Sequence, residues 1–444
     1  MSRAETSDAS APSTALLTDQ YELTMVEAAL HSRTVGRRAL FEVFARHLPH
    51  GRRYGVVAGT GRLLDALERF RFGPAELEFL RDAGIVNEQT LDYLASYRFS
   101  GDIWGYAEGD CYFPGSPILV VLAPFGEAVV LETIVLSILN HDCAIASAAS
   151  RMVTAAAGRP LIEMGSRRTH ENAGVASARA AYIAGFDTSS NLQARLEYGV
   201  PSGGTSAHAF TLLHDSERQA FATQLESLGH GTTLLVDTFD VPRAVRTAVE
   251  LAGDDLGAVR IDSGDLPSEA HQVRALLDEL GATKTRIVVT GDLDEYSIAA
   301  LAAAPVDRYG VGTSLVTGSG APTAALVYKL VARADTEGST GVLRPMAKRS
   351  VGKPGIGGRK WAVRHRDHSG TAQVELITLA PPDHGPNDRI LLHPLVRDGE
   401  IIGRQSLQAA RDRHRAALAE LPGHALQLSR GYPAIPTVFE PHGD

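Results

Sequence analysis

Seven short apolar runs, each ending in small or polar residues and each followed by helix-like sequence, dominate the chain between residues 160 and 320. Their ends lie 18 to 32 residues apart. Roughly 25 residues make one strand–loop–helix–loop unit, so this spacing predicts parallel strands in a closed or nearly closed α/β barrel of about seven units. The runs end near Glu163, Asp187, Thr205, Asp237, Asp262, Gly291 and Gly312.

The chain of 444 residues is too long for one ordinary domain, and its pattern changes on both sides of this region. Residues 1–14 are rich in Ser, Ala and Thr and are expected to form a disordered lead-in. Residues 15–135 predict a mixed α+β domain, and residues 136–340 the barrel. Residues 341–444 start with a basic, glycine-rich loop and should pack on the N-terminal domain, because their strands are too few to stand alone. The predicted fold class is α/β.

Periodicity also predicts individual elements. Helices are expected over 16–30 and 61–70, and strands over 40–46, 54–58 and within 102–123. Residues 125–157 are apolar on nearly all sides, which predicts a buried connecting helix broken near Asn140. Later helices are predicted over 173–184, 242–251, 268–280, 295–303 and 405–421, and later strands over 361–364 and 373–379.

Composition excludes several classes of function. A net charge of -9 argues against a nucleic-acid partner, which needs a basic face. No uninterrupted run of about 18 apolar residues occurs, so no membrane span is expected, and the first residues lack the order of a signal peptide. The two cysteines, Cys111 and Cys143, give neither a disulfide framework nor zinc-ligand spacing. We therefore expect a cytoplasmic protein.

The ends of the apolar runs carry polar side chains of the kinds that bind a phosphorylated sugar. In α/β barrels the chemistry lies at the carboxyl ends of the strands. Arginines and glycine turns bind phosphate, and carboxylates bind magnesium or sugar hydroxyls. These positions predict a site for a magnesium-bound phosphosugar: Arg167, Arg168, His170, Asp187, Ser189, Thr205, His208, Asp237, Asp262, Ser263, Asp265, Asp292, Thr313 and Ser314.

Within this set, the segment 203–208 combines two glycines, two hydroxyls and a histidine after a turn. Glycines let phosphate oxygens approach backbone N–H groups, and an imidazole can move a proton or accept a phosphoryl group. Each member also has a structural alternative: Asp237 and Asp262 as helix caps, His208 as a structural histidine, Arg167 in a salt bridge. Their occurrence on successive strand ends favours the site. No lysine precedes Lys284, which argues against a Schiff-base barrel enzyme.

The ordered motifs resemble those of the nicotinate phosphoribosyltransferase family between about residues 16 and 360. Several of these motifs are common when taken singly, but the ordered set is specific. The zinc-type cysteine cluster of some relatives is absent, so no structural zinc is expected. The motifs are LLTDQYELTM (16–25), FEVFARHLP (41–49), LETIVLSILN (131–140), EMGSRRTH (163–170), GTSAHAF (204–210), VRIDSGDL (259–266), VTGDLDE (289–295) and GVGTSLVTG (310–318).

The resemblance implies a two-domain type II phosphoribosyltransferase, usually a homodimer with shared active sites. It implies that nicotinate and phosphoribosyl pyrophosphate give nicotinate mononucleotide and pyrophosphate in NAD recycling, with ATP hydrolysis coupled and Mg2+ present. His208 matches the histidine that ATP phosphorylates in this family. Tyr21 matches the aromatic side chain that stacks on the pyridine ring, usually across the dimer.

The remaining site residues also follow from the resemblance. His208, Asp262 and Arg260 match catalytic positions, and Asp262 and Asp265 match the carboxylates on the ribose and magnesium side. Lys348 and Lys353 match positions near pyrophosphate or ATP. The substrate-binding set is Tyr21, Arg167, Gly204, Thr205, Ser263, Asp265, Gly291, Asp292, Gly312 and Thr313, in which the last four form turns around the 5′-phosphate.

Three alternatives stay open at this point. A nicotinamide phosphoribosyltransferase would need a pocket for a neutral amide, and a quinolinate phosphoribosyltransferase would need more cations for two carboxylates. A non-catalytic phosphosugar-binding regulator could use the same fold. The residues His208, Arg167, Asp262 and Thr313 together favour an enzyme over a regulator.

Overall fold

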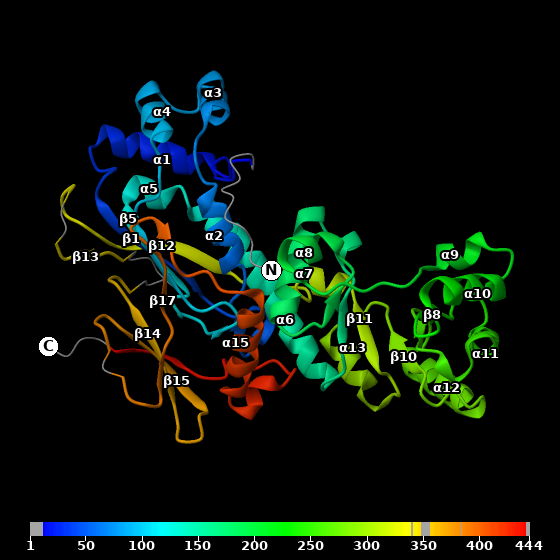
Figure 1. Cartoon of the computed structure of the whole chain (residues 1–444). Helices are drawn as coiled ribbons and strands as arrows, with labels where there is room; N and C mark the ends of the chain where they lie inside the picture. The colour runs from blue at the N-terminus through cyan, green and yellow to red at the C-terminus, as the bar shows by residue number, and fades with distance from the viewer. Residues whose placement is uncertain (1–11, 339–340, 348–355, 383, 441–444) are drawn as a thin grey trace. The chain divides into compact units, whose positions relative to one another are not determined.

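The computed structural model describes residues 12–338, 341–347, 356–382 and 384–440, and the chain forms two compact units (Figure 1). The first unit comprises residues 1–143, 323–425 and 430–444, and the second comprises residues 144–322 and 426–429. Lys348 and Lys353 lie outside the described residues, as does most of the lead-in.

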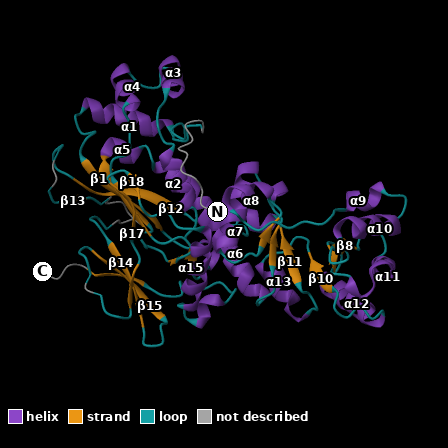
Figure 2. Ribbon diagram, viewed as in Figure 1, coloured by secondary structure: helices purple, strands orange, loops and turns teal. Residues whose placement is uncertain are grey.

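A seven-stranded antiparallel sheet forms the centre of the first unit (Figure 2). Its inner strand β1 (Arg38–Ala45) is buried over most of its length, and helix α5 (Phe125–Val129) packs on it. Helices α1 (Gln20–His31), α2 (Thr60–Glu68), α3 (Pro74–Asp82) and α4 (Glu88–Ala95) also belong to this unit. In spatial order the strands are β13 (Arg344–Pro345), β12 (Leu326–Arg333), β1 (Arg38–Ala45), β5 (Leu119–Pro124), β3 (Asp102–Gly105), β17 (His393–Arg397) and β18 (Glu400–Ile401).

The C-terminal segment adds a second sheet and helix α15 (Leu407–Ala419) to the same unit. In spatial order its strands are β16 (Asp388–Ile390), β14 (Trp361–Arg366), β15 (Ala372–Thr378) and β19 (Thr437–Glu440). A separate pair, β2 (Gly55–Val56) and β4 (Cys111–Tyr112), lies in the N-terminal part. Strand β17 pairs with β3, so residues about 290 positions apart share one sheet.

Buried charges attach the C-terminal strands to the N-terminal part of this unit. Arg364 on β14 is fully buried and donates to Asp110, 3.1 Å away, and to Glu375, 2.5 Å away. Arg389 on β16 donates to the other oxygen of Asp110 at 2.5 Å. Burial opposes charge on Asp110, but the two guanidiniums outweigh it and lower the pKa of this carboxyl. Every charge in this cluster therefore has a partner, as burial requires.

The second unit is built on six parallel strands, and its helices flank them (Figures 1 and 2). An isolated parallel bridge joins Ser189 to Ser202, where a seventh strand was predicted. The prediction of an α/β barrel-like fold with a separate mixed domain is confirmed. In spatial order the strands are β7 (Thr188–Ser189), β6 (Leu161–Glu163), β11 (Arg308–Val311), β10 (Arg286–Val289), β9 (Ala258–Ile261) and β8 (Thr233–Leu235).

The helices of the second unit follow the strands as the spacing predicts. Helices α11 and α12 pack against each other. Asp240 and Asn191 cap helices α11 and α8 with their side chains. Residues 144–156 of α6 (Glu132–Ala156) also belong to this unit. The α-helices of this unit after β6 are α7 (Glu171–Ile183), α8 (Leu192–Tyr198), α9 (His208–Leu213), α10 (Glu217–Leu228), α11 (Val241–Ala252), α12 (Leu266–Glu279), α13 (Glu295–Ala300) and α14 (Thr313–Val316).

Two predictions about elements are wrong, and two helices were missed. Helices α3 and α4 were not predicted, and the first helix begins at Gln20 rather than residue 16, with Asp19 at its N-cap position but without a side-chain capping bond. The long helix is interrupted between α5 and α6 (Glu132–Ala156), not near Asn140. The side chain of Asn140 bonds to Leu326 N and O and so leaves its own helix intact.

The stretch 125–156 is long and apolar enough to cross a membrane, judged by length and composition alone. Of its most apolar 18-residue window, 61% is buried within the protein. The core helix of a soluble protein passes the same test, so this stretch is weak evidence for a membrane span.

His414 on α15 gives the first unit a predicted pH dependence. Its Nδ1 lies 3.0 Å from the carbonyl oxygen of Gly109, and burial lowers its pKa from 6.5 to about 4. Between these values the unfolded chain binds more protons than the folded protein. The free energy of unfolding should therefore fall as the pH drops from 6.5 to about 4, by on the order of 3 kcal/mol at most, and be fully restored above pH 6.5.

Urea unfolding of the wild type and of His414→Gln across this pH range checks the prediction. The variant should lose much of the slope, whereas His365→Gln, at a half-exposed histidine beside Asp388, should keep it. Parallel pH profiles for wild type and His414→Gln would contradict it.

Candidate active site

The carboxyl ends of the parallel strands meet at one edge of the second unit's sheet, and the predicted polar residues follow these ends. Residues 164–170 follow β6, Asp237 follows β8, and residues 262–265 follow β9. Gly291 and Gly312 follow β10 and β11. The parallel register therefore brings five separate loops of the chain to the same edge.

Asp237, in the loop after β8, joins the loop after β9 to helix α9. Its Oδ1 lies 3.1 Å from Nε2 of His208, the first residue of α9. Its Oδ2 accepts from the backbone N–H of Asp262 at 2.9 Å and from the hydroxyl of Ser263 at 2.7 Å. The Asp237 side chain is 3% exposed, whereas His208 is 40% exposed. The carboxylate thus orients the imidazole through Nε2 and leaves much of the ring accessible to solvent.

This geometry decides between the alternatives for Asp237. Helix α11 is capped by Asp240, which accepts from Arg243 N, and not by Asp237. Asp265 stands at the N-cap of α12 but makes no side-chain capping bond. The helix-cap alternative is therefore wrong for Asp237.

Asp262 is fixed from two sides. Its backbone N–H donates to Asp237, and its Oδ1 accepts from the hydroxyl of Thr290 at the end of β10. Gly291 follows with a φ of +135°, a conformation that side chains other than glycine rarely adopt. The carboxylate of Asp262 is thus held at the meeting point of the loops after β8, β9 and β10.

Two arginines place positive charge beside these carboxylates. Arg260 lies on β9 and is partly buried, and among the described residues its buried Nε has no hydrogen-bond partner. Burial lowers the pKa of Arg260, while Asp262 and Asp237 act to raise it and Arg167 to lower it. Arg167 is exposed in the turn after β6. The site combines an exposed and a partly buried guanidinium with two carboxylates.

A buried carboxylate holds the turn that carries Arg167. Glu163, at the end of β6, accepts from the backbone N–H of Gly165 at 2.5 Å and from the hydroxyl of Ser189 on β7. Asn191 donates to Ser166 in the same turn at 2.8 Å. Burial raises the pKa of Glu163, although both hydrogen bonds act to lower it. The position of Arg167 therefore depends on residues from β6 and β7.

Close packing between the turns after β6 and β11 requires glycine. A Cβ on Gly165 would lie 2.2 Å from the side chain of Val316, and one on Gly310 would lie 2.8 Å from Sδ of Met164, which follows β6. Gly312 is the N-cap of α14, and Thr313 follows it with an exposed side chain. These glycines bring Thr313 and the Arg167 turn to neighbouring positions, since β11 and β6 are adjacent strands.

Other predicted residues lie apart from the hydrogen-bonded cluster. Gly204, Thr205, Asp265 and Asp292 are exposed on the loops at this edge, and among the described residues no side-chain hydrogen bond joins them to the cluster. Tyr21 belongs to the first unit, where it is 47% exposed on α1. Its predicted role, stacking on the pyridine ring, concerns the active site of another copy of the chain.

One strand-end prediction is wrong. Asp187 precedes β7 instead of ending it, and its carboxylate accepts from Leu161 N at the start of β6 at 3.0 Å. This carboxylate therefore lies at the amino ends of the strands and not at their carboxyl ends. The two-residue length of β7 is too short for periodicity to fix its end.

Three supporting residues received no specific role in the prediction. Asp237 was counted among the strand-end residues of the phosphosugar site without a catalytic or binding assignment, and Glu163 marked the end of a strand only. Thr290 was part of a motif without a function. Each immediately ends or follows an apolar run, and that position was the available signal.

Comparison with known proteins shows which family this chain belongs to. Residues 16–140 match the family model of the nicotinate phosphoribosyltransferase (NAPRTase) N-terminal domain. Nicotinate phosphoribosyltransferase pncB1 of Mycobacterium tuberculosis is 59% identical over 432 residues, which cover 95% of this chain and 94% of the relative. The chain belongs to the nicotinate phosphoribosyltransferase family.

Further relatives agree with this assignment. Nicotinate phosphoribosyltransferase of Bacillus subtilis is 37% identical over 330 residues, covering 72% of this chain and 67% of that protein. The crystal structure of human nicotinic acid phosphoribosyltransferase superimposes with a TM-score of 0.81 at 24% identity, covering 96% of this chain and 97% of that one. At this identity the human structure supports the fold alone.

Removal of the Asp237 carboxylate should loosen the loop after β9 in this family member. In Asp237→Ala the Asp262 amide loses its acceptor, and such a loss costs about 1–3 kcal/mol. We expect hydrogen exchange in a peptide covering 260–266 to accelerate about tenfold or more, measured by mass spectrometry. Asp292→Ala, an exposed carboxylate on the next loop, should leave it unchanged. Equal exchange in wild type and Asp237→Ala would contradict the role assigned to Asp237.

Proposed function

We propose that this protein is a nicotinate phosphoribosyltransferase that forms nicotinate mononucleotide and pyrophosphate from nicotinate and phosphoribosyl pyrophosphate in NAD recycling. ATP hydrolysis is coupled to the reaction through a phosphohistidine at His208. The observation that carries the proposal is the Asp237-centred joining of His208, Asp262 and Ser263 at one sheet edge, in a chain 59% identical to nicotinate phosphoribosyltransferase pncB1.

His208 has the features of a phosphoryl acceptor. Its Nε2 faces Asp237 while much of the ring remains exposed. A carboxylate on one ring nitrogen fixes the tautomer and leaves the other nitrogen available as the nucleophile. In this proposal the γ-phosphoryl group of ATP transfers to the other nitrogen, Nδ1, and ADP leaves.

Charge at this edge suits transfer of a ribosyl group. Positive charge develops on the ribose as the bond to pyrophosphate breaks, and the carboxylate of Asp262 stabilises it. The leaving pyrophosphate gains negative charge, which arginines stabilise. Arg260 supplies a partly buried guanidinium whose Nε has no partner among the described residues, so it can donate to an anionic substrate group.

Magnesium fits the donors at this edge when phosphate completes its coordination. In the part of the chain that the structure describes, no three His, Cys, Asp or Glu side chains gather in a group that could hold a metal ion. Mg2+ is commonly bound through one or two carboxylates together with substrate phosphates and water. Asp262 and Asp265 are the carboxylates that would hold it, and the ion would neutralise charge on pyrophosphate.

We propose that the protein is a cytoplasmic homodimer in which Tyr21 of one copy stacks on the nicotinate ring in the site of the other. Exposure of this aromatic side chain on α1 supports that role. Nicotinate is anionic at neutral pH, so an arginine near its carboxylate would favour it over the neutral amide.

Product analysis tests the proposal together with the role of His208. Nicotinate, phosphoribosyl pyrophosphate and Mg2+ should give nicotinate mononucleotide and pyrophosphate, faster with ATP, whereas nicotinamide and quinolinate should react poorly. His208→Gln should lose ATP stimulation and labelling by γ-labelled ATP, because the nucleophilic ring is gone. Chromatography and a pyrophosphate-release assay measure both.

His271→Gln is the matched control, because His271 is exposed on helix α12. It should retain stimulation and label. Full ATP stimulation with label still incorporated in His208→Gln would refute the phosphohistidine, and absence of pyrophosphate release with all substrates would favour a non-catalytic regulator.

Arg167 is expected to recognise an anionic substrate group. Arg167→Gln should lower kcat/KM for nicotinate about tenfold or more, chiefly through KM, because a charged hydrogen bond is lost. The preference for nicotinate over nicotinamide should shrink in the same variant if that group is the pyridine carboxylate. Arg218→Gln, an exposed arginine paired with Glu250, is the control and should have wild-type kinetics. Unchanged kinetics in Arg167→Gln would remove this residue from the site.

A further inference from the structure

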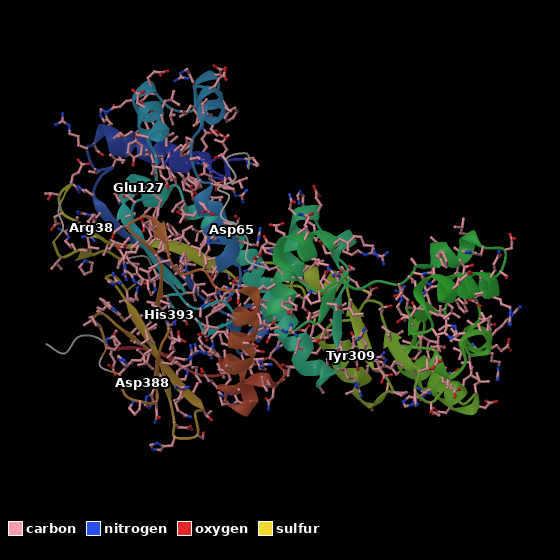
Figure 3. All side chains as sticks on the ribbon, in the orientation of Figure 1. Arg38, Asp65, Glu127, Tyr309, Asp388 and His393 are labelled. Atoms are coloured by element: carbon pink, nitrogen blue, oxygen red, sulfur yellow. The ribbon has the colours of Figure 1, made fainter. Side chains whose placement is uncertain are left out.

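A cavity of about 350 Å3 lies within the first unit, and none of the proposed active-site residues lines it. Strands β3, β5 and β17 contribute to one side and strands β14 and β16 to the other. His393, labelled in Figure 3, begins β17, the strand that carries the lining residues Pro394 and Arg397. The walls are largely apolar and include Trp104, Trp361, Ile390, Leu392 and Pro394. A cavity of this size and lining is typical of small-molecule sites.

Two indole rings in this cavity hold one guanidinium. The guanidinium carbon of Arg359 lies 3.9 Å from the centre of the Trp104 ring and 5.0 Å from the centre of the Trp361 ring. Such cation–π contacts orient an arginine but use none of its hydrogen-bond donors. The N–H groups of Arg359 therefore remain available.

Arg359 lacks the kind of acid partner that Lys360 and Arg364 of the same unit have. No hydrogen bond or ion pair of its guanidinium with another described residue occurs in the structure. The adjacent Lys360, by contrast, lies 2.6 Å from the buried carboxylate of Glu42, and Arg364 contacts two carboxylates. Burial lowers the pKa of Arg359, Asp102 acts to raise it, and Arg38 to lower it. The donors of Arg359 are not among the buried unpaired atoms, so they are open to water, and an anion that enters the cavity can replace that water as their acceptor.

The other cationic side chains on the cavity lining are Lys360 and Arg397, and no carboxylate lies on it among the described residues. Arg397 is exposed and makes no ion pair with a described residue. A ligand that entered this cavity would therefore meet aromatic walls and a positive field.

We propose that this cavity is a second ligand site, which binds a small planar aromatic anion by stacking on the indoles and by accepting hydrogen bonds from Arg359. The anionic group is a carboxylate or a phosphate, because both match the fork of an arginine. This site is additional to the proposed active site and does not depend on the reaction assigned there.

The sequence provides a specific reporter for this cavity. The chain has two tryptophans, Trp104 and Trp361, and both line it. Tryptophan emission of the full-length protein, excited selectively over tyrosine, should change saturably on titration with an aromatic anion. Benzoate tests the carboxylate, adenosine monophosphate and nicotinate mononucleotide test the phosphate, and neutral benzamide should give no saturable change.

Variants separate binding from general structural effects. Arg359→Gln should weaken the apparent affinity about tenfold or more, because the charged hydrogen bonds are lost. Arg397→Gln should weaken it less, and Arg81→Gln, at an exposed arginine of α3 outside the cavity, should leave it unchanged. Arg359→Gln should also keep wild-type activity in the absence of added ligand, and a thermal melt should show that it is folded.

Three outcomes would overturn the proposal. One is that no probe gives a saturable change of emission. Another is that Arg359→Gln, or Arg397→Gln if Arg359→Gln does not fold, binds as tightly as Arg81→Gln with every probe. The third is emission that responds to protein concentration and to no anion, which would mean that a second copy of the chain covers the cavity.

Discussion

Parallel pairing of short strands is the constraint on which the proposed chemistry depends. Because β6, β8, β9, β10 and β11 run in the same direction, each loop that follows a strand emerges at the same edge. Residues about 150 positions apart, such as Glu163 and Thr313, can then belong to one site. An antiparallel arrangement would send alternate loops to opposite edges.

At this edge a single carboxylate makes hydrogen bonds to several elements. Asp237 has two oxygens, and they serve His208 from α9 together with the backbone and side chain of the loop after β9. The side chain is almost fully buried, so these bonds are shielded from water and stronger than exposed ones would be. The nearby guanidiniums of Arg260 and Arg167 balance the charge of the carboxylates. Loss of Asp237 would therefore disturb groups of different predicted roles together.

The sequence predicted the barrel-like fold well because the spacing of apolar runs carries information over 150 residues. It predicted elements such as α11 and α12 nearly to their ends. It failed where the signal is local and weak. Strand β7 has two residues, and the prediction therefore put Asp187 at its end instead of before it. A helix break was expected near Asn140, but its side chain bonds to Leu326 and the helix continues. Asp237 and Glu163 were underrated for another reason. Their importance lies in bonds to residues about 25 positions away, which no single segment reveals.

The first unit stabilises the fully buried Arg364 and the half-buried Arg359 in different ways, and this contrast supports the proposed second ligand site. Arg364 is fully buried, and Glu375 and Asp110 more than offset the cost of its burial and raise its pKa. Arg359 has aromatic rings in place of acids, and burial lowers its pKa. If Arg359 served only to link strands, a carboxylate at the position of a ring would stabilise the charge better. Rings that leave the guanidinium donors open, beside an open volume, instead suit a planar anion that supplies the missing charge itself.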